Sequence, residues 1–291
     1  MKKPILEIQN FTKYYGNILA VKNLNLSLEE GEVFGFIGPN GAGKSTTIRS
    51  VMNFINKTEG NVYFEGKELT RDNISLKEEI GYLPSEVNLY EDFTVKEMLD
   101  FHESFYKKNI HKKRVELVKK LKIDESKKIE DLSFGNLKKV GIVLAFMHEP
   151  RLLILDEPTS GLDPIMQQVF FDMIKEEKKK GTTVFYSTHI LSEISKICDR
   201  VGIIKEGELL NVQTIEELQE KNQVYVVIES KDCEKIIKDF KLDNVSVENS
   251  SIRFQSPFSS NELIQKLSKY NIQKILIEEA TLEDIFLHYY E

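Results

Sequence analysis

The chain has 291 residues, of which 41% are hydrophobic and 30% charged, and it contains 15 glycines and 7 prolines. This composition excludes collagen-like and low-complexity proteins and indicates a large folded domain with a smaller one beside it. The net charge of -7 disfavours nucleic acid as the main partner. The longest stretch without an acidic or basic residue is about a dozen positions, at 181–192, whereas a membrane-spanning helix needs roughly 20. Because no secretory leader precedes Ile5, we expect a cytoplasmic protein.

Three apolar runs predict the central strands of the larger domain. Val33–Ile37 ends in a glycine-rich loop, and a helix is predicted to follow at 45–53. Two similar runs lie at 152–155 and 183–186. Nearly continuous apolar runs are typical of parallel strands that are covered on both faces, which predicts an α/β fold. Turn sequences at 64–67 and 205–208 predict antiparallel hairpins beside this sheet.

The segment from Glu86 to Pro150 has a helical pattern and is predicted to form a helical subdomain. It is also rich in basic residues, with Glu116 the only nearby acid in the sequence. Two interpretations stay open, a solvated helix face or a surface near anionic lipid or a partner protein. The basic residues are Lys107, Lys108, Lys112, Lys113, Arg114, Lys119, Lys120 and Lys122.

The pattern changes again after Leu210 and predicts a second domain. Strands are expected at 224–228, 245–247, 252–254 and 274–277, and helices at 233–240 and 261–270. This order, strand-helix-strand-strand-helix-strand, indicates a ferredoxin-like α+β module. A terminal helix is expected from Leu282. We therefore predict one domain at 1–214 and an accessory domain at 223–291.

The loop after the first apolar strand fits the phosphate-binding pattern G-x-x-x-x-G-K-[ST]. Its glycines allow backbone N–H groups to close around phosphate oxygens, and the helix that follows adds positive potential. The side chain of Lys44 is expected between the β- and γ-phosphates of a nucleoside triphosphate, Ser45 on Mg²⁺ and Thr46 at the α-phosphate. The predicted phosphate-binding residues are Gly38, Asn40, Gly41, Ala42, Gly43, Lys44, Ser45 and Thr46.

Two carboxylates follow the strand at 152–155. Asp156 is expected to face the metal ion, and Glu157 is placed to polarise an attacking water. A strand that ends in acidic residues is common, so by itself it is weak evidence for a nucleotide-binding site. Together with the glycine-rich loop, it predicts a P-loop nucleotidase.

The order of the surrounding motifs resembles the ATP-binding cassette (ABC) family. Leu132–Asn136 is similar to the signature segment of the family, and residues 160–163 and 187–189 match the segments that follow the carboxylates. The resemblance covers about residues 5 to 210. It implies that Tyr15 stacks on adenine, that Ser133 and Gly135 meet the γ-phosphate, and that His189 contacts it. It also implies that Asp163 lies at an interface between two subunits.

The sequence departs from the family pattern at two places. Ser85 stands where family members usually carry a glutamine that reaches Mg²⁺, and the signature has Phe134 and Asn136 in place of Gly and Gln. Ser85 is too short to reach the metal directly, so water or an inward turn of Glu86 is needed to fill the gap. We expect nucleotide binding to be retained and coupling through this loop to differ.

The resemblance implies a mechanism with partners. Two nucleotide-binding subunits, identical or different, pair head to tail with ATP between them, and separate integral membrane subunits dock on the helical region. The ending at 279–287 and the accessory domain resemble exporter ATPases of the ABC-2 type, so we expect export of a peptide, antibiotic or similar amphipathic compound from the cytoplasmic face of the membrane. The alternatives are a soluble ABC ATPase that remodels nucleic acid or ribosomes, and a nucleotide kinase or GTPase.

Overall fold

A computed structural model describes residues 4–220, 224–242, 245–248, 250–256 and 258–279. The chain divides into two compact units, residues 1–214 and 215–291, each described here by itself. Within the described residues, no helix combines the length and the apolar character that crossing a bilayer requires.

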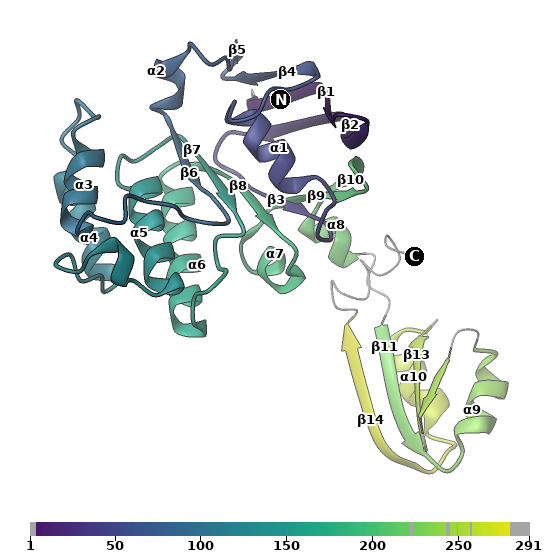
Figure 1. The fold of residues 1–291 in the computed structure, drawn as a ribbon. Coiled ribbons are helices and arrows are strands. Elements are labelled where there is room, and N and C mark those ends of the chain that lie inside the picture. The colour runs from purple at the N-terminus through teal and green to yellow at the C-terminus, as the bar shows by residue number, and fades with distance from the viewer. Residues whose placement is uncertain (1–3, 221–223, 243–244, 249, 257, 280–291) are drawn as a thin grey trace. The chain divides into compact units, whose positions relative to one another are not determined.

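The first unit is built on a six-stranded sheet with the strand order β10-β9-β3-β8-β7-β6 (Figure 1). All neighbouring strands are parallel except β9 and β10, which form the hairpin predicted at 205–208. The three apolar runs form central strands, as predicted, and every residue of these strands is buried. The bounds are β3 (Val33–Ile37), β6 (Ile80–Leu83), β7 (Leu152–Asp156), β8 (Thr183–Thr188), β9 (Arg200–Lys205) and β10 (Glu208–Thr214).

A four-stranded antiparallel sheet, in the order β2-β1-β4-β5, packs against this sheet. The predicted hairpin at 64–67 joins β4 to β5. Side chains of both sheets share one apolar core, in which the rings of Phe36 and Phe185 lie 5.4 Å apart. The bounds are β1 (Pro4–Tyr15), β2 (Ile18–Glu29), β4 (Glu59–Phe64) and β5 (Lys67–Glu68).

Helices connect the parallel strands, and α3 to α5 lie at the end of the unit away from the four-stranded sheet (Figure 1). The predicted helix at 45–53 forms as α1, two residues shorter at its end. Thr94 and Glu97 form a capping box that starts α3. The bounds are α1 (Lys44–Val51), α2 (Ile74–Lys77), α3 (Val95–Glu103), α4 (His111–Lys120), α5 (Phe134–Phe146), α6 (Pro164–Lys179) and α7 (Leu191–Ile197), with a 3-10 turn at Ile129–Asp131.

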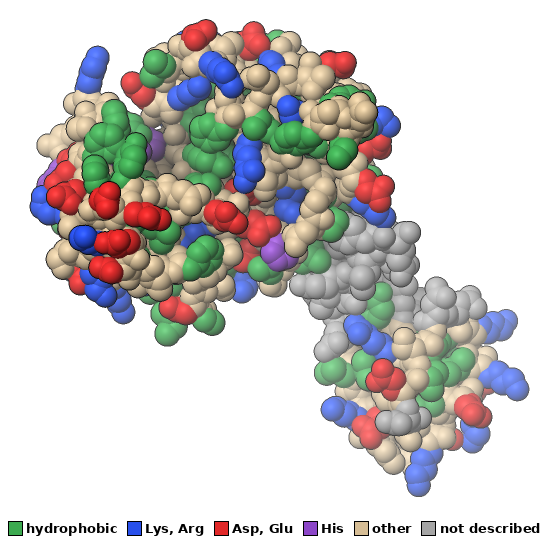
Figure 2. Space-filling view, viewed as in Figure 1, with side chains coloured by type: hydrophobic (Ala, Val, Ile, Leu, Met, Phe, Trp, Pro, Cys, Tyr) green, Lys and Arg blue, Asp and Glu red, His purple; other side chains and the backbone are tan. Residues whose placement is uncertain are grey.

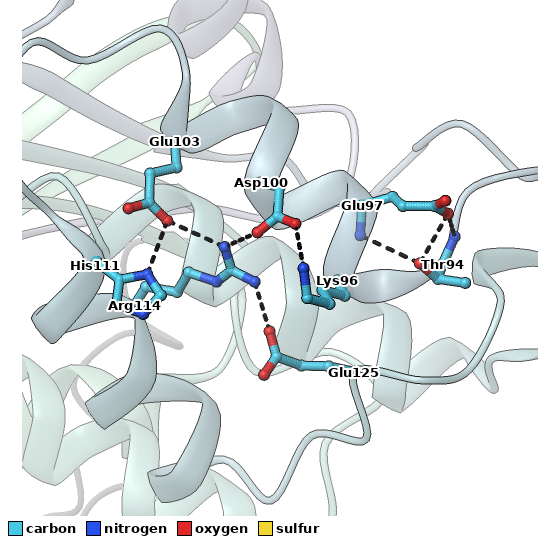
Figure 3. A network of polar contacts seen from close by, with 8 residues as sticks. All are labelled: Thr94, Lys96, Glu97, Asp100, Glu103, His111, Arg114 and Glu125. Carbon is cyan, nitrogen blue, oxygen red and sulfur yellow. Dashed lines mark hydrogen bonds and ion pairs between the residues drawn. The ribbon is translucent and has the colours of Figure 1, made fainter.

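Arg114 of α4 is the centre of a polar network in the helical region (Figure 3). Its side chain is only 4% exposed and binds three carboxylates, with Nη1 on Asp100 and, at 3.0 Å, Glu103, and with Nη2 on Glu125 at 2.7 Å. Lys96 pairs with the other Asp100 oxygen at 2.6 Å, and His111 with Glu103 at 3.4 Å. The network therefore joins α3, α4 and the loop after α4.

Four of the eight basic residues at 107–122 form ion pairs with carboxylates from other segments of the chain. Besides Arg114, these are Lys108 with Glu149, Lys113 with Glu177, and Lys120 with Glu176. In three dimensions Glu116 is therefore not the only acid near these basic residues. This pairing disfavours a basic surface that binds anionic lipid, and because Lys113 and Arg114 are buried, these two residues do not form a solvated helix face either.

Replacing Arg114 with methionine is expected to lower the free energy of unfolding by about 2 kcal/mol, because the variant leaves three carboxylates without their shared cation. The value is below the usual cost of breaking a buried pair because the carboxylates are themselves partly exposed. Lys96→Met is the matched control, since Lys96 is 65% exposed and pairs with one member of the same network. Urea unfolding tests the pair, and an equal small loss in both variants would contradict a structural role for Arg114.

His148 is buried between α5 and β7 without a partner for its polar atoms. It is 6% exposed, neither ring nitrogen has a hydrogen-bond partner, and its ring stacks on Tyr106 at 4.7 Å. Burial, and secondarily the nearby His102, lower the pKa of His148 to about 4. The native protein therefore holds this imidazole neutral.

The folded chain is expected to lose stability as the pH falls from about 6.5 to about 4, because the unfolded chain binds a proton at His148 that the native state excludes. Above about pH 6.5, His148 is neutral in both the folded and the unfolded chain and no longer lowers the free energy of unfolding. Between pH 7.5 and pH 5 the loss is about 2 kcal/mol. His148→Phe retains the stacked ring and is expected to remove this part of the loss in urea unfolding. His111→Phe, at an exposed histidine, serves as the control, and an equal acid sensitivity of His148→Phe and the parent would contradict the assignment.

The second unit contains the predicted order of strands and helices. Its four antiparallel strands lie in the order β12-β13-β11-β14 around a small apolar core that includes Val226, Ile236 and Phe254. The helix predicted at 261–270 ends three residues earlier, and the helix expected from Leu282 lies outside the described residues. The bounds are α8 (Ile215–Glu220), β11 (Val224–Ser230), α9 (Cys233–Phe240), β12 (Ser246–Glu248), β13 (Ser251–Ser256), α10 (Ser260–Leu267) and β14 (Ile272–Glu279).

Candidate functional site

The register of the central sheet brings three predicted motifs to one edge. Ile37 at the end of β3 pairs with Thr188 at the end of β8, and Ser187 of β8 pairs with Asp156 at the end of β7. The glycine-rich loop, Glu157 and His189 are the next residues in the chain after these three strand ends. Because the strands are parallel, all three motifs emerge at the carboxyl edge, which is where open α/β sheets bind ligands.

The glycine-rich loop wraps around the side chain of Lys44. The Lys44 Nζ donates to the carbonyl oxygens of Gly38 at 2.7 Å and Pro39 at 3.1 Å. Gly43 has a φ of 106°, and a Cβ at this position would lie 2.8 Å from a backbone oxygen, so only glycine fits. Burial lowers the pKa of Lys44, and the charges of Glu157 and Asp156 partly offset this effect.

A hollow opens above this loop. It is lined by Ala20, Asn40, Gly41, Gly43, Lys44, Ser45, Thr46 and Glu157. Six of the eight residues predicted to bind phosphate line it, and the other two, Gly38 and Ala42, are buried. Lys44, which carries an ammonium group, and Ser45 and Thr46, which carry hydroxyl groups, therefore line the same space.

Asp156 has one satisfied and one unsatisfied oxygen. Its Oδ1 accepts from the Ser187 hydroxyl at 3.1 Å, whereas its Oδ2 is buried without a hydrogen-bond partner. Burial raises the pKa of this carboxyl, and the Ser45 and Ser187 side chains partly offset the rise. A buried carboxylate oxygen without a partner is a donor atom available to a cation.

Glu157 lies between two hollows and contacts His189. Its Oε1 is 3.0 Å from the His189 Nδ1, and its backbone N–H donates to Ser187. The residue has a φ of 45°, a left-handed conformation that few non-glycine residues adopt and that often occurs at functional sites. The second hollow is lined by Glu157, Thr159, Ser160, Gly161, Gln167, Thr188, His189 and Ile190.

The signature segment lies against the loop that follows Glu157 and not against the phosphate-binding loop. A Cβ added to Gly135 would lie 2.5 Å from the Gly161 oxygen, and one added to Gly161 would meet the Phe134 ring at 2.2 Å. Ser133 is exposed and starts α5 as its N-cap. Asp163 similarly caps α6, accepting from the Met166 N–H at 2.9 Å. In the described part of the chain, Ser133, Gly135 and Asp163 line neither hollow.

The loop at Ser85 is held by a lysine that the sequence interpretation missed. Lys138 of α5 is 1% exposed, and its Nζ donates to the carbonyl oxygens of Pro84 and Ser85, each at 2.9 Å. Burial lowers its pKa to about 8, although the charges of Asp156 and Glu157 act in the opposite direction. Glu86 is exposed in this structure, and its inward turn toward a bound metal ion stays a prediction.

Two exposed aromatic features flank these motifs. Tyr15 ends β1 with 46% of its surface exposed, and the Lys13 Nζ lies 4.8 Å from the centre of its ring. The other feature is an aromatic patch formed by the segment before α3, by α3 itself and by the turn after it, in the helical region where Figure 2 shows hydrophobic side chains on the surface. The aromatic patch consists of Tyr90, Phe93, Phe101 and Phe105, whose neighbouring rings lie 4.9 to 6.2 Å apart.

Comparison with known proteins decides the family. A family model described as ABC transporter matches residues 21–160. The chain is 33% identical to a bacitracin transport ATP-binding protein of Bacillus licheniformis, over 97% of this chain and 96% of that protein. The chain belongs to the ABC transporter family. It is an ABC transporter ATPase, the ATP-binding subunit of a transporter.

Other comparisons agree with this membership of the ABC family. The chain is 36% identical to a linearmycin resistance ATP-binding protein of Bacillus subtilis, over 72% of this chain and 69% of that protein. Its fold resembles the dimeric ATP-binding cassette MJ0796 bound to ADP and phosphate, with a TM-score of 0.66 and 26% identity over 72% of this chain and 98% of that one. The cassette fold of the first unit is thus that of ABC ATPases, and the kinase and GTPase alternative is wrong.

Two buried charged residues of this ABC ATPase, Glu193 and Lys138, were missed by the sequence interpretation, although the hydrophobic pattern of their helices indicates that they are buried. Glu193 is buried in α7 together with Ile194 and Ile197, and Lys138 is buried in α5 one turn before the buried Ile142. A charged residue within an apolar helical stripe indicates a buried polar group that needs specific partners. Which partners these are depends on segments distant in the sequence.

Proposed function

We propose that this ABC ATPase powers export of a peptide, antibiotic or similar amphipathic compound through separate membrane subunits. The observation that carries the proposal is the similarity to the bacitracin transport protein, which extends over nearly the whole length of both chains and so includes the accessory unit. The linearmycin resistance protein is a second relative, whose name refers to resistance to linearmycin. The alternative is an ABC ATPase that is not coupled to transport.

Hydrolysis is assigned to Glu157 as the base, with His189 and Lys44 at the γ-phosphate. The 3.0 Å contact between Glu157 and His189, beside the hollow that Lys44 lines, supports this arrangement. Tyr15 is proposed to stack on adenine. Mg²⁺ fits the unpartnered Asp156 Oδ2 and the Ser45 hydroxyl, with Ser85 as a further, water-mediated ligand. When bound, Mg²⁺ neutralises phosphate charge.

A second nucleotide-binding subunit is proposed to complete the site. Ser133 and Gly135 are accessible at the start of α5, but within one chain they lie against Gly161 and not at the phosphate-binding hollow. A head-to-tail partner, identical or different, brings its own copies of these residues to the γ-phosphate, and Asp163 is then at the interface. The dimeric cassette MJ0796 supports this arrangement.

The membrane subunit is proposed to dock on the aromatic patch, at the cytoplasmic face of the membrane. Tyr90, Phe101 and Phe105 are exposed there although they are large and apolar, which is typical of an interaction surface. Tyr90 of the patch follows the Ser85 loop in the chain, and Lys138 ties this loop to α5. Docking is therefore expected to act on a loop close to Asp156 and Glu157.

The experiment is affinity purification of the tagged full chain from detergent-solubilised membranes, followed by identification of the proteins that copurify. Copurification of an integral membrane protein is the expected result, and Phe101→Asp and Phe105→Asp are expected to abolish it. Ile74→Asp, at an exposed apolar residue in α2, is the matched control. Copurification of ribosomes or nucleic acid in place of a membrane protein would favour the alternative.

The accessory unit at 223–291 is proposed to be a ferredoxin-like domain that contributes to dimer contact or regulation. Its order of elements and its antiparallel sheet support this assignment.

A chain that ends at Asn222 is expected to bind ATP as tightly as the full chain, because every residue assigned to the phosphates lies before it. Titration with a fluorescent ATP analogue measures this affinity. Circular dichroism establishes that the truncated chain is folded, and a folded truncation that does not bind ATP would contradict the division into domains.

A further inference from the structure

Glu193 is a buried carboxylate whose hydrogen-bond partners are all hydroxyl groups. The side chain is 3% exposed and accepts from the hydroxyls of Thr159, of Tyr186 at 2.9 Å and of Thr188 at 2.7 Å. The three hydroxyl-bearing residues are buried as well. Within the described residues, no basic side chain is paired with this carboxylate, so its position depends on the hydroxyl groups alone.

The hydroxyl groups come from two segments of the site. Thr188 immediately precedes His189, and its oxygen also accepts from the Ile190 N–H at 3.0 Å, so it fixes the backbone on both sides of the histidine. Thr159 begins the loop that runs past Gly161 to Asp163, against which the signature segment packs. Glu193 is therefore a shared acceptor for the His189 turn and the 159–163 loop.

We propose that Glu193 is a positioning residue for ATP hydrolysis, which holds the His189 turn and the 159–163 loop in one fixed arrangement. Through His189 it sets the contact with Glu157, and through Thr159 it sets the loop that leads to the subunit interface. A change at one segment is thereby transmitted to the other. This inference rests on the proposed assignment of Glu157 and His189 to hydrolysis.

The chemistry of a carboxylate explains why this position suits glutamate. An ionised carboxylate only accepts hydrogen bonds and has about four lone-pair directions, which is enough for three donors. The amide of a glutamine has one accepting oxygen, and its NH₂ group forces at least one hydroxyl to reverse its role. Glu193→Gln therefore preserves the volume of the side chain while disturbing the link between the two segments.

The experiment measures steady-state ATP hydrolysis by the full chain. Glu193→Gln is expected to lower kcat by about 10- to 100-fold, which corresponds to the free energy of losing hydrogen bonds to a charged group. The KM for ATP is expected to change by less than about two-fold, because no residue of the phosphate-binding loop is altered. Thr188→Val, which keeps the shape but removes the hydroxyl, is expected to lower kcat in the same way. Thr188→Ser, which keeps the hydroxyl, is expected to recover most of that loss.

A mutant cycle between Thr159→Val and Thr188→Val separates this linkage from ordinary structural damage. In the parent background, the double variant is expected to lose less kcat than the product of the two single losses, because both substitutions break the same hydrogen-bond network. In the Glu193→Gln background each is expected to change kcat by less than about two-fold. Multiplicative losses in both backgrounds, or a kcat of Glu193→Gln within two-fold of the parent, would overturn the inference.

Two further measurements keep the outcomes distinct. The thermal midpoint of each variant, followed by circular dichroism, establishes that assays are made on folded protein. Glu157→Gln tests the assignment of the base in the same assay, so its failure is seen separately from a failure of the Glu193 inference. Glu234→Gln, at an exposed glutamate of α9, is the matched control for the chemical change and is expected to retain the parental kcat.

Discussion

Replacing Glu157 with glutamine is expected to lower the turnover of ATP by about 100- to 10,000-fold, while ATP affinity is retained. The amide cannot accept the proton of the attacking water or polarise it as a carboxylate does. The hollow proposed to hold the phosphates keeps Lys44, Ser45 and its glycines unchanged. Because hydrolysis no longer removes the γ-phosphate, the variant is expected to accumulate as an ATP-bound dimer.

Phosphate release measures the turnover of this variant, and gel filtration with ATP and Mg²⁺ measures the dimer. Glu216→Gln makes the same chemical change at an exposed residue of α8 and is expected to behave as the parent. If Glu157→Gln hydrolysed ATP within a few-fold of the parental rate, Glu157 would not be the base. A loss of turnover without any dimer would instead point to impaired nucleotide binding.

The second large effect is expected at Lys44. Lys44→Ala removes the one ammonium group that lines the hollow above the phosphate-binding loop and is expected to raise the Kd for ATP by about 10- to 100-fold. The loop also loses the two hydrogen bonds from the Lys44 Nζ to Gly38 and Pro39. Both changes weaken nucleotide binding, so the main defect of the variant is expected in its Kd for ATP and not in the rate at which bound ATP is hydrolysed.

Isothermal titration with ATP and Mg²⁺ measures the affinity of the Lys44 variant. Lys179→Ala, at an exposed lysine near the end of α6, is the matched control and is expected to bind ATP as the parent does. An unchanged Kd for Lys44→Ala would show that this ammonium group does not face the phosphates.

Several features of this protein followed from its sequence alone. The apolar runs at 33–37, 152–155 and 183–186 are strands because a strand that is buried on both faces has no polar alternation, and few other structures accommodate such short runs. The glycine-rich loop was equally clear, since its spacing is imposed by phosphate geometry. The order of elements in the second unit followed from changes in hydrophobic period.

Only the tertiary structure decided how the polar side chains are paired. Arg114 was assigned to a basic helix face, but folding places three carboxylates from other segments around it. The partners of Lys138 and Glu193 are 53 or 54 residues away in the first case, and 5 to 34 residues away in the second. Hydrophobic patterns report which residues are buried, because burial depends on local period and composition. Hydrogen bonds and ion pairs are directional and short-ranged, so their partners depend on how strands and loops from distant parts of the chain come together.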